Sequence, residues 1–177
     1  MNEHAKIKEA QYFLSLLPEL KNDRDKFIHN LSAFLTAGRS ALQYAREEAE
    51  GKRKGLRWYD RHVASSKIIR FLKEKRDLNI HVNPVSPNAR LTVHIKDVAS
   101  FSASLLIATI REDGTIKKEE LSPVSWSSPS KSEVTATQEY FFPDWAGDGD
   151  VIALCEMYLK EIETIIADGV KRGFLTP

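Results

Sequence analysis

The sequence is poor in cysteine, glycine and proline. Its 177 residues include one Cys, 8 Gly and 7 Pro. A single cysteine, Cys155, excludes an intramolecular disulfide, and the five scattered histidines cannot complete a cysteine-rich zinc site with it. The few glycines do not form the glycine-rich loops that hold phosphates in P-loop and dinucleotide-binding folds. We therefore expect a folded protein with no metal site and no bound cofactor.

The sequence also lacks long apolar runs. No stretch approaches the roughly 18 apolar residues that a membrane-spanning helix needs. The first ten residues are charged where a signal peptide would be apolar. Together with the single cysteine, these features predict a cytoplasmic protein that does not bind a membrane.

Charge is distributed unevenly along the chain. The 26 Lys and Arg nearly balance the 25 Asp and Glu, which leaves a formal net charge of +1. Residues 51–76, however, contain ten Lys and Arg against two acidic residues, so this segment carries +8 and the rest of the chain −7. Such a run is most often the solvated face of a helix, but it can also attract phosphate groups.

Apolar residues recur at helical spacing in four stretches of the chain. The predicted helices cover residues 4–17, a stretch from an N-cap at Asn22 or Asp23 to about Glu50, residues 56–82, and residues 150–172. Ser65 and Ser66 mark a place where the third helix could bend or break. Small residues on the second helix would let another helix pack close to it: Ala33, Ala37, Gly38 and Ala41.

Between the third and fourth helices the apolar period changes to two, which is typical of strands. Apolar and polar residues alternate over 90–96, and residues that favour strands recur at 101–111. Residues 133–142 form a further candidate strand. Asp113–Gly114 is typical of a two-residue type I′ hairpin turn between Ile110 and Ile116. The stretch 122–132, with six Ser and two Pro, predicts a loop.

These elements predict a mainly α fold: a four-helix up-down bundle with an antiparallel β-meander inserted between the third and fourth helices. The chain would form one domain. Within it, residues 1–83 would carry helices one to three, residues 84–143 the β insertion, and residues 144–177 the C-terminal helix.

An arginine and a histidine stand five positions apart near the end of the predicted third helix, in Arg76–Asp77–Leu78–Asn79–Ile80–His81. The same spacing occurs at Arg24–His29 and at Arg57–His62. The Arg24 pair begins a helix, and the residue after Arg57 is a tryptophan. Only the pair Arg76–His81 lies late in a helix with a polar residue directly after the arginine.

This pair resembles the R-x4–6-H motif of the HEPN superfamily, small helical bundles that include ribonuclease toxins and nuclease domains of defence systems. A likeness to bacterial proteins with HEPN-like folds extends over most of the chain, through residues 27–35, Arg39–Ser40, Trp58–Tyr59 and residues 140–145. The resemblance implies an HEPN-like bundle. It also implies RNA as substrate and a homodimer in which the motifs of two protomers face one cleft.

Metal-independent RNA cleavage needs a base for the 2′-hydroxyl and a fixed cation beside the phosphorane. We therefore expect His81 to act as base or acid and Arg76 to hold the phosphate, with Asp77 and Asn79 in support. Further phosphate contacts are expected from the basic segment, at Arg57, Arg61, Arg70 and Lys73. Five residues are about 140° around a straight helix, so Arg76 and His81 converge only if the helix ends or bends before His81.

Three other interpretations stay open. The motif can be structural, with Asp77 paired to a lysine, Arg76 bound to a buried carboxylate and His81 at the helix C-terminus. It can bind RNA or a nucleotide without cleaving it. Alternatively, the protein is an interaction module whose β insertion recruits a protein partner, in which case exposed apolar residues are expected on that insertion.

Overall fold

The structure is a computed structural model that describes residues 2–81, 87–96, 100–103, 106–110, 116–120, 124–127 and 133–177. Side chains are described at residues 2–77, 87–93 and 136–177. The chain is mainly helical and divides into two compact units. The helical unit comprises residues 1–90 and 138–177, and the ribbon unit comprises residues 91–137.

Three helices form the main body of the helical unit, and all three were predicted from the sequence: α1 (Asn2–Leu16), α2 (Arg24–Glu50) and α5 (Val151–Lys171). Both long helices begin at an aspartate cap. The Asp23 carboxylate accepts a hydrogen bond from the backbone N–H of Lys26 at 3.1 Å, and Asp150 accepts one from Ala153 at 2.9 Å. These bonds satisfy N–H groups that have no partner within the helix.

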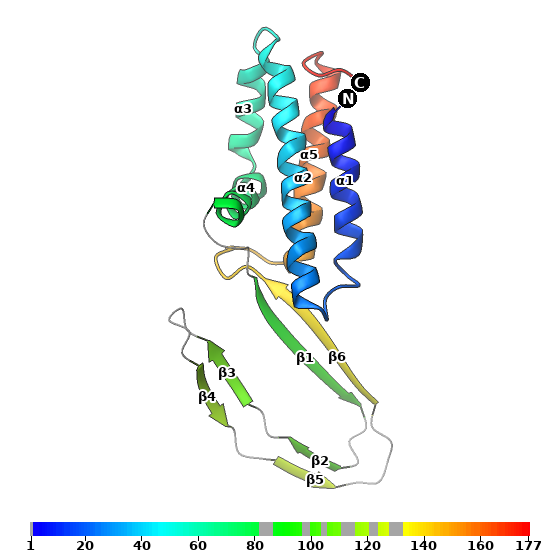
Figure 1. The fold of residues 1–177 in the computed structure, drawn as a ribbon, viewed down its shortest axis with the longest axis vertical. Coiled ribbons are helices and arrows are strands. Elements are labelled where there is room, and N and C mark those ends of the chain that lie inside the picture. The colour runs from blue at the N-terminus through cyan, green and yellow to red at the C-terminus, as the bar shows by residue number, and fades with distance from the viewer. Residues whose placement is uncertain are drawn as a thin grey trace. The chain divides into compact units, whose positions relative to one another are not determined.

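The helices α1, α2 and α5 lie side by side around one apolar core (Figure 1). Gly38 marks a close approach, because a Cβ atom there would lie 2.6 Å from Cε1 of the buried Tyr158 ring. The small residues of α2 thus admit a neighbouring helix, as expected. That neighbour is α5 of the same chain: Ala37, Gly38 and Ala41 are buried within the helical unit. These residues therefore do not offer an open surface to a second copy.

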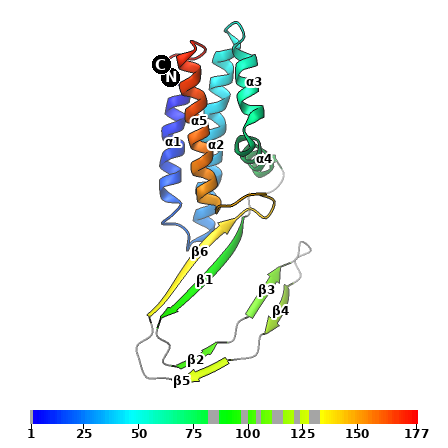
Figure 2. The ribbon, with the colours of Figure 1, turned by 180° about the vertical axis from the view of Figure 1, so that it is seen from behind.

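The predicted third helix is two helices, α3 (Gly55–Ser65) and α4 (Lys67–His81), so the described residues form five helices. Ser66 separates them in an extended conformation (φ −85°, ψ 114°). Its side chain accepts a hydrogen bond from the N–H of Ile69 at 3.3 Å, and its own N–H donates to the carbonyl of His62. Ser66 therefore ends one helix and begins the next, and α4 turns away from the direction of α3 (Figures 1 and 2).

The segment after the last strand fixes the position of α4. Phe71 on α4 packs edge-on against Phe142 and contacts Trp145, with ring centroids 5.5 and 4.9 Å apart. Lys75 pairs with Asp144. The described contacts of this segment hold α4 in the helical unit.

The inserted strands form three two-stranded sheets rather than the predicted meander. The strands are β1 (Asn88–Lys96), β2 (Ser100–Ala103), β3 (Leu106–Ile110), β4 (Ile116–Glu120), β5 (Val124–Ser127) and β6 (Glu133–Phe141). Their pairing is nested, β1 with β6, β2 with β5 and β3 with β4, whereas a meander pairs consecutive strands. The prediction of a loop over 122–132 was also wrong, because β5 lies within it and pairs with β2.

The register of the innermost pair confirms a hairpin but differs from the predicted turn. Ile110 pairs with Ile116, which leaves an odd number of residues between them. A two-residue turn at Asp113–Gly114 without a bulge would instead pair Ile110 with Lys117. The turn itself lies outside the described residues.

Candidate functional site

Arg76 lies near the end of α4, with its side chain turned partly into the helical unit. The side chain is 24% exposed, and its Nη1 donates a hydrogen bond of 3.3 Å to the Asp77 carboxylate. Its Nε is buried and has no hydrogen-bond partner among the described residues. Burial raises the pKa of Tyr158 on α5, and the positive charges of Arg39 and Arg76 oppose that rise. Arg76 thus lies near the core, and its Nε–H donor has no acceptor among the described residues.

The rest of the predicted motif is only partly described. The structure brings Arg76 and Asp77 into contact, so among the described side chains Asp77 pairs with an arginine and not with a lysine. The side chains of Asn79 and His81 lie outside the described residues. The backbone of α4 is helical as far as His81. The helix therefore does not end before His81, and an end or a bend there was the expected condition for Arg76 and His81 of one chain to converge.

The basic segment divides into cations with structural contacts and cations that face solvent. Lys67 donates to the carbonyl of Ala146 at 3.1 Å, and Lys75 pairs with Asp144. The four predicted phosphate-binding residues Arg57, Arg61, Arg70 and Lys73 are exposed. In the described part of the chain none of these four forms an ion pair.

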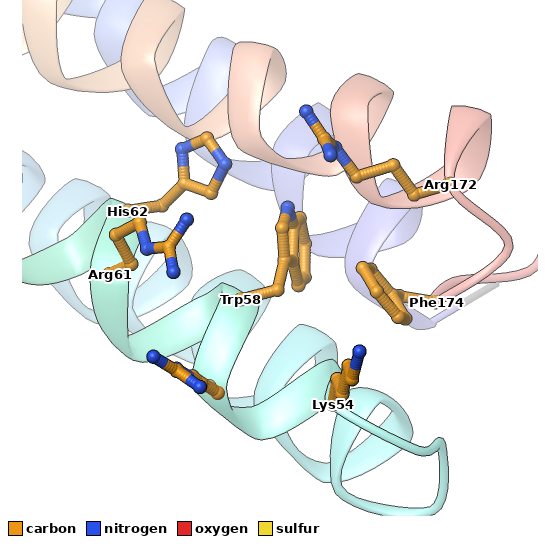
Figure 3. Close-up of a pocket in the computed structure, with 7 residues that line it drawn as sticks. Lys54, Trp58, Arg61, His62, Arg172 and Phe174 are labelled. Atoms are coloured by element: carbon orange, nitrogen blue, oxygen red, sulfur yellow. The ribbon is translucent and has the colours of Figure 1, made fainter.

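A pocket of about 480 Å³ lies between α3 and the end of α5 (Figure 3). Four cationic side chains line it: Lys54, Arg57, Arg61 and Arg172. The rings of Trp58, His62 and Phe174 complete the lining. We call this site the α3 pocket. It contains two of the four predicted phosphate-binding residues, and the other two, on α4, do not line it.

Asp168 organises the inner wall of the α3 pocket. Its carboxylate accepts hydrogen bonds from Trp58 Nε1 at 2.7 Å and from Arg172 Nε at 2.7 and 2.9 Å, and its Oδ2 lies 3.1 Å from His62 Nε2. Burial raises the pKa of Asp168, but the hydrogen bonds from Arg172 and Trp58 outweigh burial and leave this pKa below its ordinary value. Both carboxylate oxygens are therefore engaged by groups of the protein.

The start of α3 also faces the α3 pocket. Lys54 occupies the N-cap position with φ 70°, and no side chain caps the helix there. The next residue must be small, because a Cβ on Gly55 would lie 2.1 Å from the carbonyl oxygen of Ala49. The close approach of Gly55 to Ala49 holds the loop against the end of α2, next to Lys54 at the pocket.

No pattern in the sequence predicts this pocket as a unit. His62 and Asp168 are 106 positions apart in the sequence. The pair Arg57–His62 was noted only because it has the same five-residue spacing as Arg76–His81. The i,i+4 pair Asp168–Arg172 is visible in the sequence, but such a pair predicts a helix-surface ion pair and not a site.

The described residues contain neither a candidate metal-binding cluster nor a helix that could span a membrane. No group of three or more His, Cys, Asp or Glu side chains there could hold a metal ion. No helix in the same part of the chain is long and apolar enough to cross a bilayer. Cys155 is buried on α5, and burial raises the pKa of its thiol, as expected for a small core residue.

Comparison with known proteins assigns no family. No family model matches the chain, and no curated protein and no solved structure matches it.

Proposed function

We propose that the protein is a metal-independent endoribonuclease that uses Arg76 and His81 and leaves a 2′,3′-cyclic phosphate. The observation that carries the proposal is the state of Arg76, a partly buried guanidinium whose Nε has no partner among the described residues. The Arg76 side chain is 24% exposed, and a phosphate oxygen would bind this exposed part of the guanidinium. The exposed Arg70 and Lys73 on the same helix would hold neighbouring phosphates of the RNA.

The chemistry needs no group beyond this chain and the RNA. His81 takes the proton of a 2′-hydroxyl, whose oxygen then attacks the adjacent phosphorus. Arg76 stabilises the negative charge of the phosphorane with hydrogen bonds that strengthen as charge develops. The 5′-oxygen leaves with the proton that His81 took up, which returns the histidine to its neutral form, and the cyclic phosphate remains on the other product. DNA lacks the attacking hydroxyl and is not a substrate.

The site is shared between two copies of the chain in this proposal. Because α4 is helical through His81, positions 76 and 81 are about 140° apart around a straight helix axis, so the two positions do not share one face of the helix. Two antiparallel copies of α4 would bring Arg76 of one protomer toward His81 of its partner. In an HEPN-like four-helix bundle, α3 and α4 together would take the place of the third helix.

The three arginine–histidine pairs of equal spacing provide a matched test of activity. Purified wild type, His81→Ala, His62→Ala and His29→Ala are incubated with labelled single-stranded and structured RNAs in EDTA. His81→Ala should lower the cleavage rate by about 10² to 10⁴, the usual contribution of a general base. His29 is exposed, so His29→Ala should cleave at the wild-type rate.

Arg76→Ala completes the set. It should lower the rate by about 10² or more through loss of phosphorane stabilisation. Wild type that cleaves none of the RNAs would overturn the proposal. A loss of activity in His62→Ala with none in His81→Ala would move the reaction to the α3 pocket and refute the assignment of Arg76 and His81.

Dimerisation is tested by light scattering at tens of micromolar protein. A dimer mass is expected for the wild type. A monomer mass would contradict the shared site, because the Arg76–His81 pair of one chain does not meet on a straight helix.

A second candidate function is that of a protein-interaction module, and one feature of the ribbon favours it. Leu91 and Val93 are 64% and 50% exposed, and as residues i and i+2 of β1 they lie on the same face. Exposed apolar pairs are typical of interaction surfaces. If wild type is inactive and dimeric, and Leu91→Lys with Val93→Lys makes it monomeric, this function replaces the nuclease.

A further inference from the structure

We propose that the α3 pocket binds a phosphomonoester, the doubly charged phosphate group of a small molecule such as a nucleoside 5′-monophosphate. The proposal does not depend on RNA cleavage at α4, since its residues come from α3, the loop before it and the end of α5. It rests on an excess of positive charge in one cavity and on the arrangement that maintains that excess.

The charge balance of the pocket is strongly positive. Lys54, Arg57, Arg61 and Arg172 carry four positive charges, and Asp168 carries the one negative charge at the inner wall. The acidic residue of α3, Asp60, does not line the pocket. About three positive charges therefore remain unbalanced, which fits a phosphomonoester dianion better than the single charge of a phosphodiester.

Asp168 does not compete with an incoming anion for the outer cations. Its oxygens are engaged by Trp58, His62 and Arg172, whereas no carboxylate among the described residues pairs with Arg57 or Arg61. Figure 3 shows the Arg61 and His62 side chains next to each other on α3, with Arg172 across the pocket from them. Guanidinium groups with free donors are well suited to phosphate oxygens.

The backbone around the pocket adds to this field. The first turn of α3 has no side-chain cap, and apart from the N–H of Gly55, which donates to the carbonyl of Lys52, its N–H groups add partial positive charge near Lys54. The opposite effect from the end of α5 is small, because the N–H groups of Gly173, Phe174 and Leu175 bind the last carbonyls of that helix. The helix ends thus leave the pocket positive.

The pocket is large enough for more than a phosphate ion. Its volume of about 480 Å³ lies in the range of small-molecule sites. Phe174 is partly exposed and contacts Trp58 with ring centroids 5.2 Å apart, which gives the cavity an aromatic wall beside the cations. A phosphorylated molecule with a flat ring can place its phosphate on the arginines and its ring on this wall.

Titration calorimetry with AMP, adenosine and inorganic phosphate tests the proposal on the full chain. AMP should bind with a Kd below about 1 mM. Inorganic phosphate should bind more weakly, adenosine should show no binding, and added salt should weaken AMP binding. Tighter binding of phosphate than of AMP would refute the role of the aromatic wall. No binding of AMP, or equal binding of adenosine, would overturn the proposal.

Paired charge variants locate the site. Arg57→Gln with Arg61→Gln should weaken AMP binding at least about tenfold, since two charge-assisted donors are lost. Arg70→Gln with Lys73→Gln removes the same charge from α4 and should change the affinity by less than about twofold. All four side chains are exposed, so both variants should keep the wild-type melting temperature. Equal losses in the two variants would show general attraction by a basic surface and refute the pocket.

Discussion

Replacement of Asp168 by alanine tests how the wall of the α3 pocket is held together. The substitution removes the acceptor of Trp58 Nε1, the closest carboxylate to His62 and the partner of Arg172. Trp58 is 8% exposed, so its N–H would lose its partner without regaining full access to water. We expect a decrease in the free energy of unfolding.

The magnitude follows from the exposure of each partner. A buried donor left without a partner costs about 1–3 kcal/mol, which applies to Trp58. The Arg172 side chain is 58% exposed, so its ion pair contributes only about 0.2–1 kcal/mol. The loss in Asp168→Ala should therefore be about 1–4 kcal/mol, or roughly 2–16 °C in melting temperature for a chain of this length. Asp168→Asn keeps an acceptor for Trp58 and should cost about 1 kcal/mol.

Urea unfolding followed by helical circular dichroism measures these losses, and a cycle with Trp58→Phe isolates the hydrogen bond. Asp168→Ala should cost at least about 1 kcal/mol less in the Trp58→Phe background, where the indole N–H is absent. Equal costs in both backgrounds, or a loss of less than about 0.5 kcal/mol in the wild-type background, would refute the reasoning.

The Asp168 carboxylate also makes the stability of the fold depend on pH. Because the folded state lowers the pKa of Asp168, its ionised form stabilises the fold above the pKa of the unfolded chain. The difference in stability between wild type and Asp168→Asn should shrink as the pH falls below about 5 and through the lowered pKa of Asp168. A difference that grows toward low pH would contradict this sign.

Three further substitutions or reactions test the packing of the helical unit. Gly38→Ala should lower the melting temperature, because overpacking against Tyr158 costs about 1–3 kcal/mol and outweighs the gain of roughly 1 kcal/mol in helix propensity. Tyr140→Phe should cost about 1 kcal/mol in urea unfolding, since the Tyr140 hydroxyl donates to the carbonyl of Lys21 at 3.0 Å. Cys155 should react with a thiol reagent only at the rate of unfolding, because it is fully buried and burial raises the pKa of its thiol. Stability of Gly38→Ala or Tyr140→Phe equal to the wild type, or fast labelling of native Cys155, would contradict these expectations.

Local signals in the sequence were sufficient to predict the long helices. The apolar spacing and the aspartate caps of α2 and α5 act within a few residues of each helix, so they are readable without tertiary information. The break at Ser66 was predicted only as an alternative. The break is stabilised by the cap that Ser66 provides to α4 and by the contacts of Phe71 with Phe142 and Trp145. Phe142 and Trp145 lie far along the chain from Ser66, so local sequence does not show these contacts.

Strand pairing could not be predicted from the alternating pattern. Alternation shows that a residue lies in a strand, but nested and consecutive pairing have the same local pattern. Val124–Ser127 was predicted as loop because of its serine and proline neighbours, and it is a strand because it pairs with Ser100–Ala103. The α3 pocket depends on similar long-range contacts, since Asp168 meets Trp58 and His62 only after the helices pack.

The most direct test of the proposed nuclease is a single 2′-deoxy substitution at a mapped cleavage position. An RNA is incubated with wild-type protein in EDTA, its products are mapped, and the same RNA is then prepared with deoxyribose on the 5′ side of the cut phosphate. We expect a 2′,3′-cyclic phosphate on the unmodified product and loss of cleavage at that one position in the modified RNA. No cleavage of the unmodified RNA, or continued cleavage at the deoxy position, would contradict the account.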